Sequence, residues 1–357
     1  MHTVAHLGLG NRGRLHANIF LDMADRFRLV GLCELDGARM QEYAAEKKLP
    51  TDMLYEDADA MLAATKPDVF CFVTQPAVRL PMVELAARHG VKGLALEKPM
   101  AMSVQEAWAM RKLCRDHGIK AVVSTQHKYL TSLQKLKQLL DAGEIGELQQ
   151  ITTSSQAWLA HLGSHYVDYM LWANNGVRAK WVVGHVHGRK YLEDSHAAPE
   201  YALGHAEFEN GVRGFFQWGK LAPSYMPAKS KFIDNRLTVY GTHGYLWADT
   251  NGRWGGFTKS SNGACIGEQG EPWGKQANAC AQPLYIQAFA DWLDDDAKVH
   301  PCNIELAYHG YEILDAICMS AMRRARIDLP LDPDACENVL EVMRKDLPEC
   351  PERPEAG

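Results

Sequence analysis

Two histidines, His161 and His165, stand four residues apart in the segment AWLAHLGSHYVDYMLWANNG, residues 157–176. On a helix, this spacing places both side chains on the same face. Such a pair could bind a metal ion, pack inside the fold, or transfer protons, because histidine titrates near neutral pH. The segment alone is compatible with all three roles.

Lys98 is a second residue that could do chemistry, in the segment LALEKPMA. Glu97, Lys98 and Pro99 end a predicted apolar strand, and ligands of parallel sheets bind beyond the carboxyl ends of the strands. A lysine is costly to bury there unless it has a function or a partner. The pattern is compatible with a reactive amine and with a plain salt bridge at the strand end. A cis bond before Pro99 could aim the lysine.

The segment GLGNRG contains a G-x-G-x-x-G motif, whose glycines are Gly8, Gly10 and Gly13. The motif follows the first predicted strand and opens the first predicted helix, whose N-terminal amides suit a pyrophosphate. Glu34 ends the next strand, at the distance expected of a carboxylate that binds the ribose hydroxyls. The motif therefore predicts a dinucleotide site that prefers NAD, since Glu34 would repel the 2′-phosphate of NADP. Arg12 and Arg39 are nearby cations that weaken this preference.

The elements that must position these residues change character along the chain. Apolar runs alternate with helical patterns over residues 1–125, which predicts a domain with a parallel sheet covered on both faces. Strands of alternating pattern follow a helix at 131–142 and predict a second domain, residues 126–345, with a mostly antiparallel sheet. Residues 251–282, rich in Gly, Asn and Gln, are interpreted as a long loop or an oligomer-contacting arm, before two further helices. The tail, 346–357, is expected to be disordered.

Composition excludes several classes of function. The net charge is −6 and no run of lysine and arginine is present, so nucleic-acid binding is not expected. The nine cysteines are scattered singly, which indicates reduced thiols rather than disulfides or a zinc ribbon. No long apolar segment or secretion signal is visible, so we expect a cytoplasmic protein without membrane contact.

These motifs together resemble those of the Gfo/Idh/MocA oxidoreductases, named for glucose–fructose oxidoreductase and inositol dehydrogenase. The resemblance runs through GLGNRG, VTQP, EKPMA, LLDAGEIGELQQI, GSHYVD, LTVYGTHGYL and ILDAICMSAMRRARIDLPL, and so covers nearly the whole chain. It implies an α/β fold in which a Rossmann domain precedes an α/β domain with a large open, mostly antiparallel sheet. The strand pattern agrees with this expectation.

The resemblance also implies roles for the reactive residues. In this family a lysine and a histidine at the positions of Lys98 and His165 flank the substrate near the nicotinamide, as an acid–base pair. The family has an aspartate where this chain has His161. His161 would instead bind a substrate hydroxyl, join in proton transfer or face an anionic group. No third ligand accompanies the two histidines, so we expect no metal. Asp168 matches a structural aspartate of the family.

The motifs and the resemblance define two sets of site residues. The expected cofactor contacts are Gly8, Gly10, Asn11, Arg12, Gly13, Glu34, Thr74, Gln75, Pro76, Glu97, Lys98 and Gln126. The expected substrate contacts are Lys128, Tyr129, Trp158, His161, His165 and His309. Arg79 and Lys128 hint at an anionic substrate.

Three functions are compatible with these residues. The first is an NAD-dependent dehydrogenase or reductase acting on a sugar, a polyol or a sugar-derived acid. The second is a redox-neutral glycoside hydrolase or epimerase that oxidises a sugar carbon transiently and then returns the hydride, an option that the histidine at 161 favours. The third is a catalytically silent NAD-sensing regulator. We expect a homodimer or homotetramer in each case.

Overall fold

The computed structural model describes residues 1–226 and 230–348, apart from the side chains of His161 and Asn278. Most of the predicted disordered tail, 346–357, lies outside these residues. The chain forms two compact units. The first unit consists of Met1–Ala101, Glu106–Tyr129 and Gly274–Tyr308, and the second consists of Met102–Gln105, Leu130–Trp273 and His309–Gly357.

The helices follow the order of the chain. The α-helices are α1 (Asn11–Asp22), α2 (Gly37–Lys47), α3 (Ala58–Thr65), α4 (Arg79–Arg88), α5 (Val104–Asp116), α6 (Thr131–Asp141), α7 (Ser164–Ala173), α8 (Trp273–Gln276), α9 (Gln282–Asp294), α10 (Ile304–Arg323) and α11 (Val339–Asp346). Short 3-10 turns are η1 (Thr51–Met53), η2 (Pro76–Val78) and η3 (Gln126–Tyr129). Two π-helical turns are η4 (Leu159–Gly163) and η5 (Ala277–Ala281).

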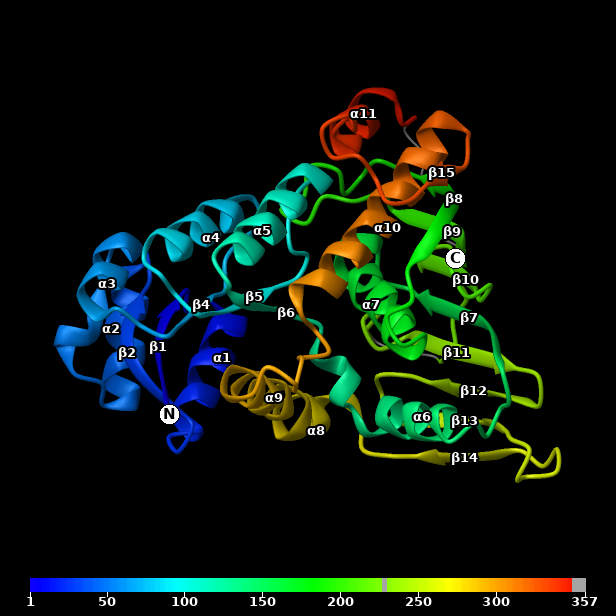
Figure 1. Ribbon diagram of the computed structural model, residues 1–357, viewed down its shortest axis with the longest axis horizontal. Coiled ribbons are helices and arrows are strands. Elements are labelled where there is room, and N and C mark those ends of the chain that lie inside the picture. The colour runs from blue at the N-terminus through cyan, green and yellow to red at the C-terminus, as the bar shows by residue number, and fades with distance from the viewer. Residues whose placement is uncertain (227–229, 349–357) are drawn as a thin grey trace, which may run out of the picture. The chain divides into compact units, whose positions relative to one another are not determined.

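The first unit contains a six-stranded sheet in the order β3-β2-β1-β4-β5-β6 (Figure 1). Its strands are β1 (His2–Leu7), β2 (Phe27–Cys33), β3 (Leu54–Tyr55), β4 (Val69–Phe72), β5 (Gly93–Glu97) and β6 (Lys120–Ser124). Every neighbouring pair is parallel. This is the strand order of a dinucleotide-binding Rossmann sheet, in which the crevice for ligands lies where the order reverses, between β1 and β4. The predicted parallel sheet is confirmed.

Helix α9 packs on this parallel sheet, although the sequence assigns its residues to the second domain. Its apolar side chains share one buried core with α1 and with the central strands. The shared core comprises Val4, Ile19, Phe20, Phe27, Val69, Cys71, Ala95, Val122, Tyr285, Ile286, Phe289, Ala290 and Cys302. Figure 1 shows α9 beside α1. The first unit therefore extends beyond residues 1–125, because one apolar helix face from late in the chain completes its core.

The second unit contains a nine-stranded sheet in the order β14-β13-β12-β11-β7-β10-β9-β8-β15. Its strands are β7 (Leu148–Ser155), β8 (Ala179–His187), β9 (Tyr201–Phe208), β10 (Arg213–Gly219), β11 (Asn235–Gly241), β12 (Gly244–Ala248), β13 (Arg253–Phe257), β14 (Ile266–Gln269) and β15 (Ile327–Asp328). Strands β7 and β10 are parallel, and the other described pairs are antiparallel. Burial alternates along β9, so one face of the sheet is covered and the other is open. The predicted mostly antiparallel sheet is confirmed.

The interpretation of residues 251–282 as a long loop is wrong. Strands β13 and β14 extend the sheet here, and α8 and η5 lead into α9. The error arose because the glycines of this segment were read as loop residues. A Cβ atom on Gly256 would lie 2.0 Å from the carbonyl oxygen of Tyr245, so glycine lets β13 approach β12 closely. A glycine inside a strand can mark such a close approach rather than a loop.

Candidate functional site

The three glycines of the first motif serve different purposes. Gly8 has φ +94°, and a Cβ atom there would lie 2.5 Å from the carbonyl oxygen of Val73. A Cβ atom on Gly13 would lie 2.0 Å from the carbonyl oxygen of Gly8, so the turn closes tightly on α1. Around Gly10, by contrast, no atom lies within 4 Å of the Cβ position. The turn thus keeps one open approach to the N-terminus of α1, where Asn11 begins the helix and no acidic residue occupies the first turn. This geometry fits a pyrophosphate.

Glu34 lies directly after β2 and is 7% exposed. Its Oε2 accepts from the amide of Leu9 at 2.6 Å, and its Oε1 accepts from the amide of Asp36 at 3.1 Å. Burial alone would raise the pKa of Glu34, but these two amides and the charge of Arg39, 3.4 Å away, outweigh burial and lower it. The carboxylate is therefore ionised and held rigidly, as an acceptor for ribose hydroxyls must be.

The segment Thr74–Gln75–Pro76 follows β4, next to the turn of the glycine motif. Among the described residues, the buried Oγ1 of Thr74 has no hydrogen-bond partner, whereas Gln75 is exposed. Pro76 begins η2. These residues lie at the carboxyl edge of the sheet, as the sequence predicts, and the buried hydroxyl of Thr74 is a donor that a bound dinucleotide could use.

Lys98 follows β5 directly, and its bond to Pro99 is cis. Burial lowers the pKa of Lys98 to about 8; the carboxylate of Glu97 opposes this shift, and the cations Arg12 and Arg79 add to it. An amine with such a pKa exchanges protons readily near neutral pH. Lys98 therefore combines a position at the ligand-binding edge of the sheet with the basicity that proton transfer requires.

Arg79 anchors the main chain around Lys98. Its guanidinium is 1% exposed and donates to the carbonyl oxygens of Thr74, at 2.7 Å, and Pro99. The carbonyl oxygen of Lys98 lies 3.5 Å from the same group. Nη1 and Nη2 therefore serve main-chain carbonyls, whereas the buried Nε has no hydrogen-bond partner among the described residues. Whether Arg79 bears on an anionic substrate stays a prediction.

Arg12, an expected cofactor contact, pairs with Glu97 in the structure. Its guanidinium donates to Glu97, through Nε at 3.2 Å and through Nη2 at 3.1 Å. In the amide orientation that satisfies both its ends, Gln126 accepts from the same Nη2 at 2.7 Å. The structure thus joins three expected cofactor residues beside Lys98, but it uses Arg12 and Glu97 as partners of each other. Whether any of them contacts a dinucleotide stays a prediction.

The turn η3 follows β6 and carries the expected substrate residues Lys128 and Tyr129. Lys128 is 1% exposed and donates to the carbonyl oxygen of Pro301. The hydroxyl of Tyr129 lies 3.5 Å from Nε2 of His300, and its ring packs against the core that α9 completes. Within the first unit, both residues therefore support the fold. His127, which the sequence analysis did not select, has a pKa lowered to about 3 by burial, with contributions from Arg12 and Lys98.

The second unit carries both His161 and His165. His165 lies in the first turn of α7, is 3% exposed, and has its Nδ1 3.0 Å from the hydroxyl of Tyr169. This contact orients the imidazole. His161 lies within the π-helical turn η4, and its side chain is outside the described part of the structure. Turns of this type inside helices are frequent at functional sites.

Trp158 precedes η4 and belongs to an aromatic cluster. Its ring stacks on Tyr191 with centroids 4.4 Å apart, and Phe232 lies 6.3 Å away. The ammonium of Lys231 sits 3.7 Å from the centroid of Trp158 and faces the other two rings at longer distances. Within residues 1–226 and 230–348, no carboxylate is recorded as an ion-pair partner of Lys231, whose pKa is lowered by burial and by the charge of Lys190. The cluster combines apolar ring faces with a cation.

His309, expected to contact substrate, is 1% exposed and bonds through both ring nitrogens. Nε2 accepts from the amide of Ala179 at 2.9 Å, and Nδ1 lies 2.9 Å from Glu312, which pairs with Arg178. Nε2 thus ties α10 to the start of β8, and Nδ1 is held by Glu312 on the same helix, so we leave His309 out of the proposed substrate site. Sequence periodicity could not distinguish a buried structural histidine from one that faces a ligand.

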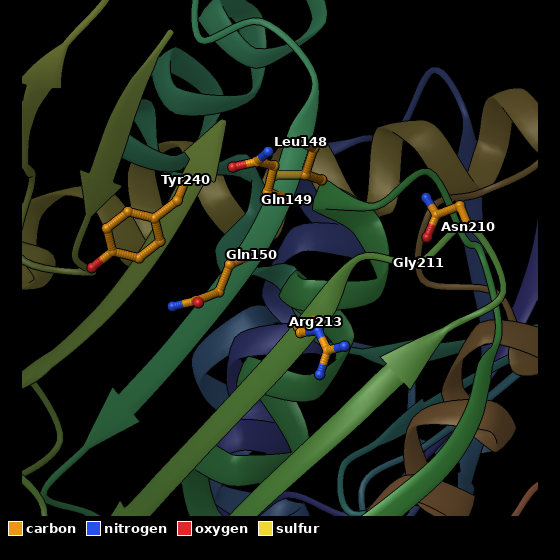
Figure 2. A pocket seen from close by; sticks show the side chains of 7 residues that line it. All are labelled: Leu148, Gln149, Gln150, Asn210, Gly211, Arg213 and Tyr240. Atoms are coloured by element: carbon orange, nitrogen blue, oxygen red, sulfur yellow. The ribbon is translucent and has the colours of Figure 1, made fainter. Parts of the chain in front are cut away.

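A pocket on the second unit lies near the starts of β7 and β10 (Figure 2). It is lined by Leu148, Gln149, Gln150, Asn210, Gly211, Arg213 and Tyr240. Gln150 pairs with Arg213 and Tyr240 on the neighbouring strands, so this pocket belongs to the open face of the sheet. It contains none of the expected site residues.

Two further features of the described chain bear on function. Among the described side chains of residues 1–226 and 230–348, which leave out those of His161 and Asn278, no three of His, Cys, Asp or Glu come together as metal ligands would. Every helix in the same ranges is too short or too polar to cross a bilayer.

Comparison with known proteins gives the family. Residues 2–125 match a domain described as "Oxidoreductase family, NAD-binding Rossmann fold", and residues 152–247 match the "GFO/IDH/MocA C-terminal domain". D-apiose dehydrogenase of Paraburkholderia graminis is 32% identical over 142 residues, 40% of this chain and only 37% of that enzyme. The scyllo-inositol 2-dehydrogenase (NAD(+)) of Bacillus subtilis is 24% identical over 265 residues, 69% of this chain and 73% of that enzyme.

Solved structures share the fold. An NAD binding oxidoreductase from Klebsiella pneumoniae superposes with a TM-score of 0.78 at 18% identity, over 92% of this chain and 99% of that one. The WlbA dehydrogenase from Bordetella pertussis, solved in complex with NADH and UDP-GlcNAcA, gives 0.72 at 20% identity, over 92% and 99%. The resemblance stated from the motifs is confirmed: both domain matches place this chain in the Gfo/Idh/MocA family of oxidoreductases, with an NAD-binding Rossmann domain.

Proposed function

We propose that this protein is an NAD-dependent dehydrogenase or reductase of a sugar, a polyol or a sugar-derived acid, with Lys98 and His165 as its acid–base pair. The observation that carries the proposal is the environment of Lys98. Lys98 directly follows β5, the strand beside β4, and its amine has a pKa of about 8. The same unit contains the open turn at Gly10 and the ionised Glu34.

Proton transfer is the step that this chain's own residues supply. When bound, NAD accepts or returns a hydride at its nicotinamide ring. Oxidation of an alcohol carbon also releases the hydroxyl proton, and the amine of Lys98 can accept that proton near neutral pH. In the reverse direction, the protonated amine returns it. Arg79 keeps the main chain of Lys98 in place, and Tyr169 orients the imidazole of His165.

The cluster around Trp158 supports the proposed substrate class. Aromatic faces suit the C–H surfaces of sugars, and the ammonium of Lys231 offers a charge that the described residues do not neutralise. The cluster therefore supports a sugar that carries a carboxylate or phosphate. Lys231 adds a cation to Arg79 and Lys128, the two that hint at an anionic substrate, and the sequence alone did not indicate it.

The first experiment separates the proposed function from its alternatives. We would purify the protein without added cofactor, denature it, and assay the supernatant for NAD and NADH. The native protein would then be mixed with NAD and matched pairs of neutral and anionic sugars, polyols and glycosides, while absorbance at the nicotinamide band is followed. We expect NADH only when both NAD and a suitable polyol or sugar are present, with the anionic member of a pair preferred.

Other results of this experiment would contradict the proposal. Cofactor that copurifies, together with glycoside cleavage or epimerisation and no net NADH, would indicate the redox-neutral mechanism. Binding of NAD without turnover of any compound in the panel would indicate a regulator. Equal rates with neutral and anionic sugars would remove the role proposed for Lys231.

Replacement of Glu34 should change the cofactor preference. In Glu34→Gln the anion that would repel a 2′-phosphate is gone, and Arg39 loses one of its two carboxylate partners. We expect the ratio of kcat/KM for NAD over NADP to fall at least about tenfold, equivalent to about 1.4 kcal/mol. Asp36→Asn, which removes the other partner of Arg39, is the matched control and should change the ratio much less. An unchanged ratio in Glu34→Gln would mean that this carboxylate does not face the ribose.

We also propose that the protein forms a homodimer or homotetramer through the open face of the nine-stranded sheet. The exposed residues Val183, Leu203 and Tyr240 lie on strands of this sheet and are 43%, 42% and 39% exposed. Apolar side chains gathered on one face commonly mark an interaction surface. Sedimentation velocity should give a multiple of the chain mass, and a single species of 39.9 kDa would contradict this proposal.

A further inference from the structure

Four side chains of the first unit form a closed ring of hydrogen bonds next to Lys98. Glu97 Oε1 accepts from Nε and Nη2 of Arg12 and lies 3.1 Å from Nε2 of His16. Gln282 closes the ring. Its Oε1 accepts from Nη2 of Arg12 at 3.2 Å. Its Nε2 lies 3.3 Å from Nδ1 and 3.2 Å from Nε2 of His16, so the tautomer decides which ring nitrogen accepts from it. The other oxygen of Glu97 lies 3.3 Å from the amide of Lys98.

One protonation state satisfies the whole ring. An ionised carboxylate can only accept, so Nε2 of His16 carries the proton and donates it to Glu97. Nδ1 of His16 is then an acceptor for the amide of Gln282. Burial lowers the pKa of His16, which keeps its imidazole neutral. Burial opposes ionisation of Glu97, but the charge of Arg12 and the hydrogen bond from His16 outweigh it and hold the pKa of the carboxyl well below its usual range.

Rigid elements hold the four members in place. Arg12 and His16 are four residues apart on α1, so they share one face of that helix. Glu97 ends β5, and Gln282 begins α9. All three elements contribute to the single buried core that α9 completes. The ring is therefore built by the same packing that joins α9 to the parallel sheet.

The ring controls which charges lie beside the reactive amine. The carboxylate of Glu97 favours the ammonium form of Lys98, and the guanidinium of Arg12 disfavours it. The Arg12 side chain is 40% exposed, so without its partners the guanidinium could turn toward solvent. Inside the ring, its distance from Lys98 is fixed.

We propose that Arg12, His16 and Gln282 are positioning residues for proton transfer, which hold the carboxylate of Glu97 and the charge of Arg12 beside Lys98 and so tune its basicity. This inference rests on the proposed function, in which Lys98 is the catalytic base. It assigns the ring a purpose other than contact with the cofactor, for which the sequence analysis selected Arg12 and Glu97.

The test measures the titration of Lys98 itself. Reductive methylation with ¹³C-formaldehyde labels lysine amines, and the NMR signal that is missing in Lys98→Arg identifies Lys98. In the unaltered protein we expect a midpoint near pH 8. Glu97→Gln should lower the midpoint by about 1 pH unit, because an attractive charge is lost, and Arg12→Gln should raise it by about 1, because a repulsive charge is lost.

Two more variants sharpen the test. Gln282→Ala keeps both charges but opens the ring, so its midpoint should lie between those of the unaltered protein and Arg12→Gln. Arg14→Gln is the matched control: it removes the same charge from the same helix, but Arg14 pairs with Glu42 outside the ring, so the midpoint of Lys98 should not move. Thermal unfolding, followed by circular dichroism, shows whether each variant is folded.

Opposite displacements in the two charge variants, with Gln282→Ala between, would support the inference. Equal midpoints in all the folded variants would overturn it. Displacement of both charge variants in the same direction would also overturn it, because a general loosening of the site would then be the cause. If a charge variant does not fold, Gln282→Ala decides. A midpoint above that of the unaltered protein would support the inference, and an equal midpoint would overturn it. The titration needs no substrate, so full dehydrogenase activity in Lys98→Met would refute the proposed function separately.

Discussion

Lys98→Met should lower the rate of hydride transfer by about 10²- to 10⁴-fold, the range over which a positioned acid or base accelerates a reaction. The thioether fills a similar space but cannot accept a proton. Affinity for NAD should change little, since the turn at Gly10 and the carboxylate of Glu34 are untouched. The free energy of unfolding should stay equal or rise, because an amine whose pKa burial lowers to about 8 is held as an ammonium at a cost.

The measurement is single-turnover formation of NADH with the substrate that the panel identifies, over a range of pH. In the unaltered protein, oxidation should slow as the pH falls below about 8, because the neutral amine is the active form and the ammonium replaces it. Reduction should show the opposite dependence. Lys98→Arg is the control, because a guanidinium keeps the charge but is not a base in this range, so it should be as slow as Lys98→Met. A rate within threefold of the original in either variant would refute the role of Lys98.

Local patterns were sufficient to predict most of the fold. The glycine turn, the buried run of β4 and the strand that ends at Glu97 each predict a parallel strand from a few neighbouring residues, and the structure has all three. The position of α9 could not be predicted in this way. Its apolar face, which includes Tyr285 and Phe289, would suit either sheet, and only the three-dimensional core shows which one it covers. Gly256 shows the converse error, since a residue typical of loops permits a strand contact there.

The residues of the candidate site were also predictable only where a short segment identifies them. The motif glycines, Glu34 and Lys98 were selected because their chemistry depends on their place in a short segment. The ring beside Lys98 was missed because its members are distant in the sequence. His16 follows Arg12 by four residues, a signal that was visible, but Gln282 is 266 residues beyond His16. Polar partners so far apart come together only when the core that carries them is known.

Gly10 and Gly13 belong to one motif, but the same substitution by alanine should affect different properties at the two positions. Gly13→Ala should destabilise the protein by about 2 kcal/mol or more, because the new methyl group would lie 2.0 Å from the carbonyl oxygen of Gly8 and α1 would have to move. Gly10→Ala should leave stability within about 0.5 kcal/mol, since its φ of −62° suits any residue and nothing lies within 4 Å of the added atom.

Affinity for NAD should fall in Gly10→Ala, although the stability of this variant is unchanged. The methyl group of Gly10→Ala projects into the open approach at the N-terminus of α1, so we expect Kd for NAD to rise at least about tenfold, or about 1.4 kcal/mol. Urea unfolding measures the stability, and isothermal titration calorimetry measures Kd for NAD. Gly274→Ala, also without a neighbour within 4 Å, is the control and should alter neither. If Gly10→Ala bound NAD as the unaltered protein does, the pyrophosphate would have to lie elsewhere, and the open space at Gly10 would need another explanation.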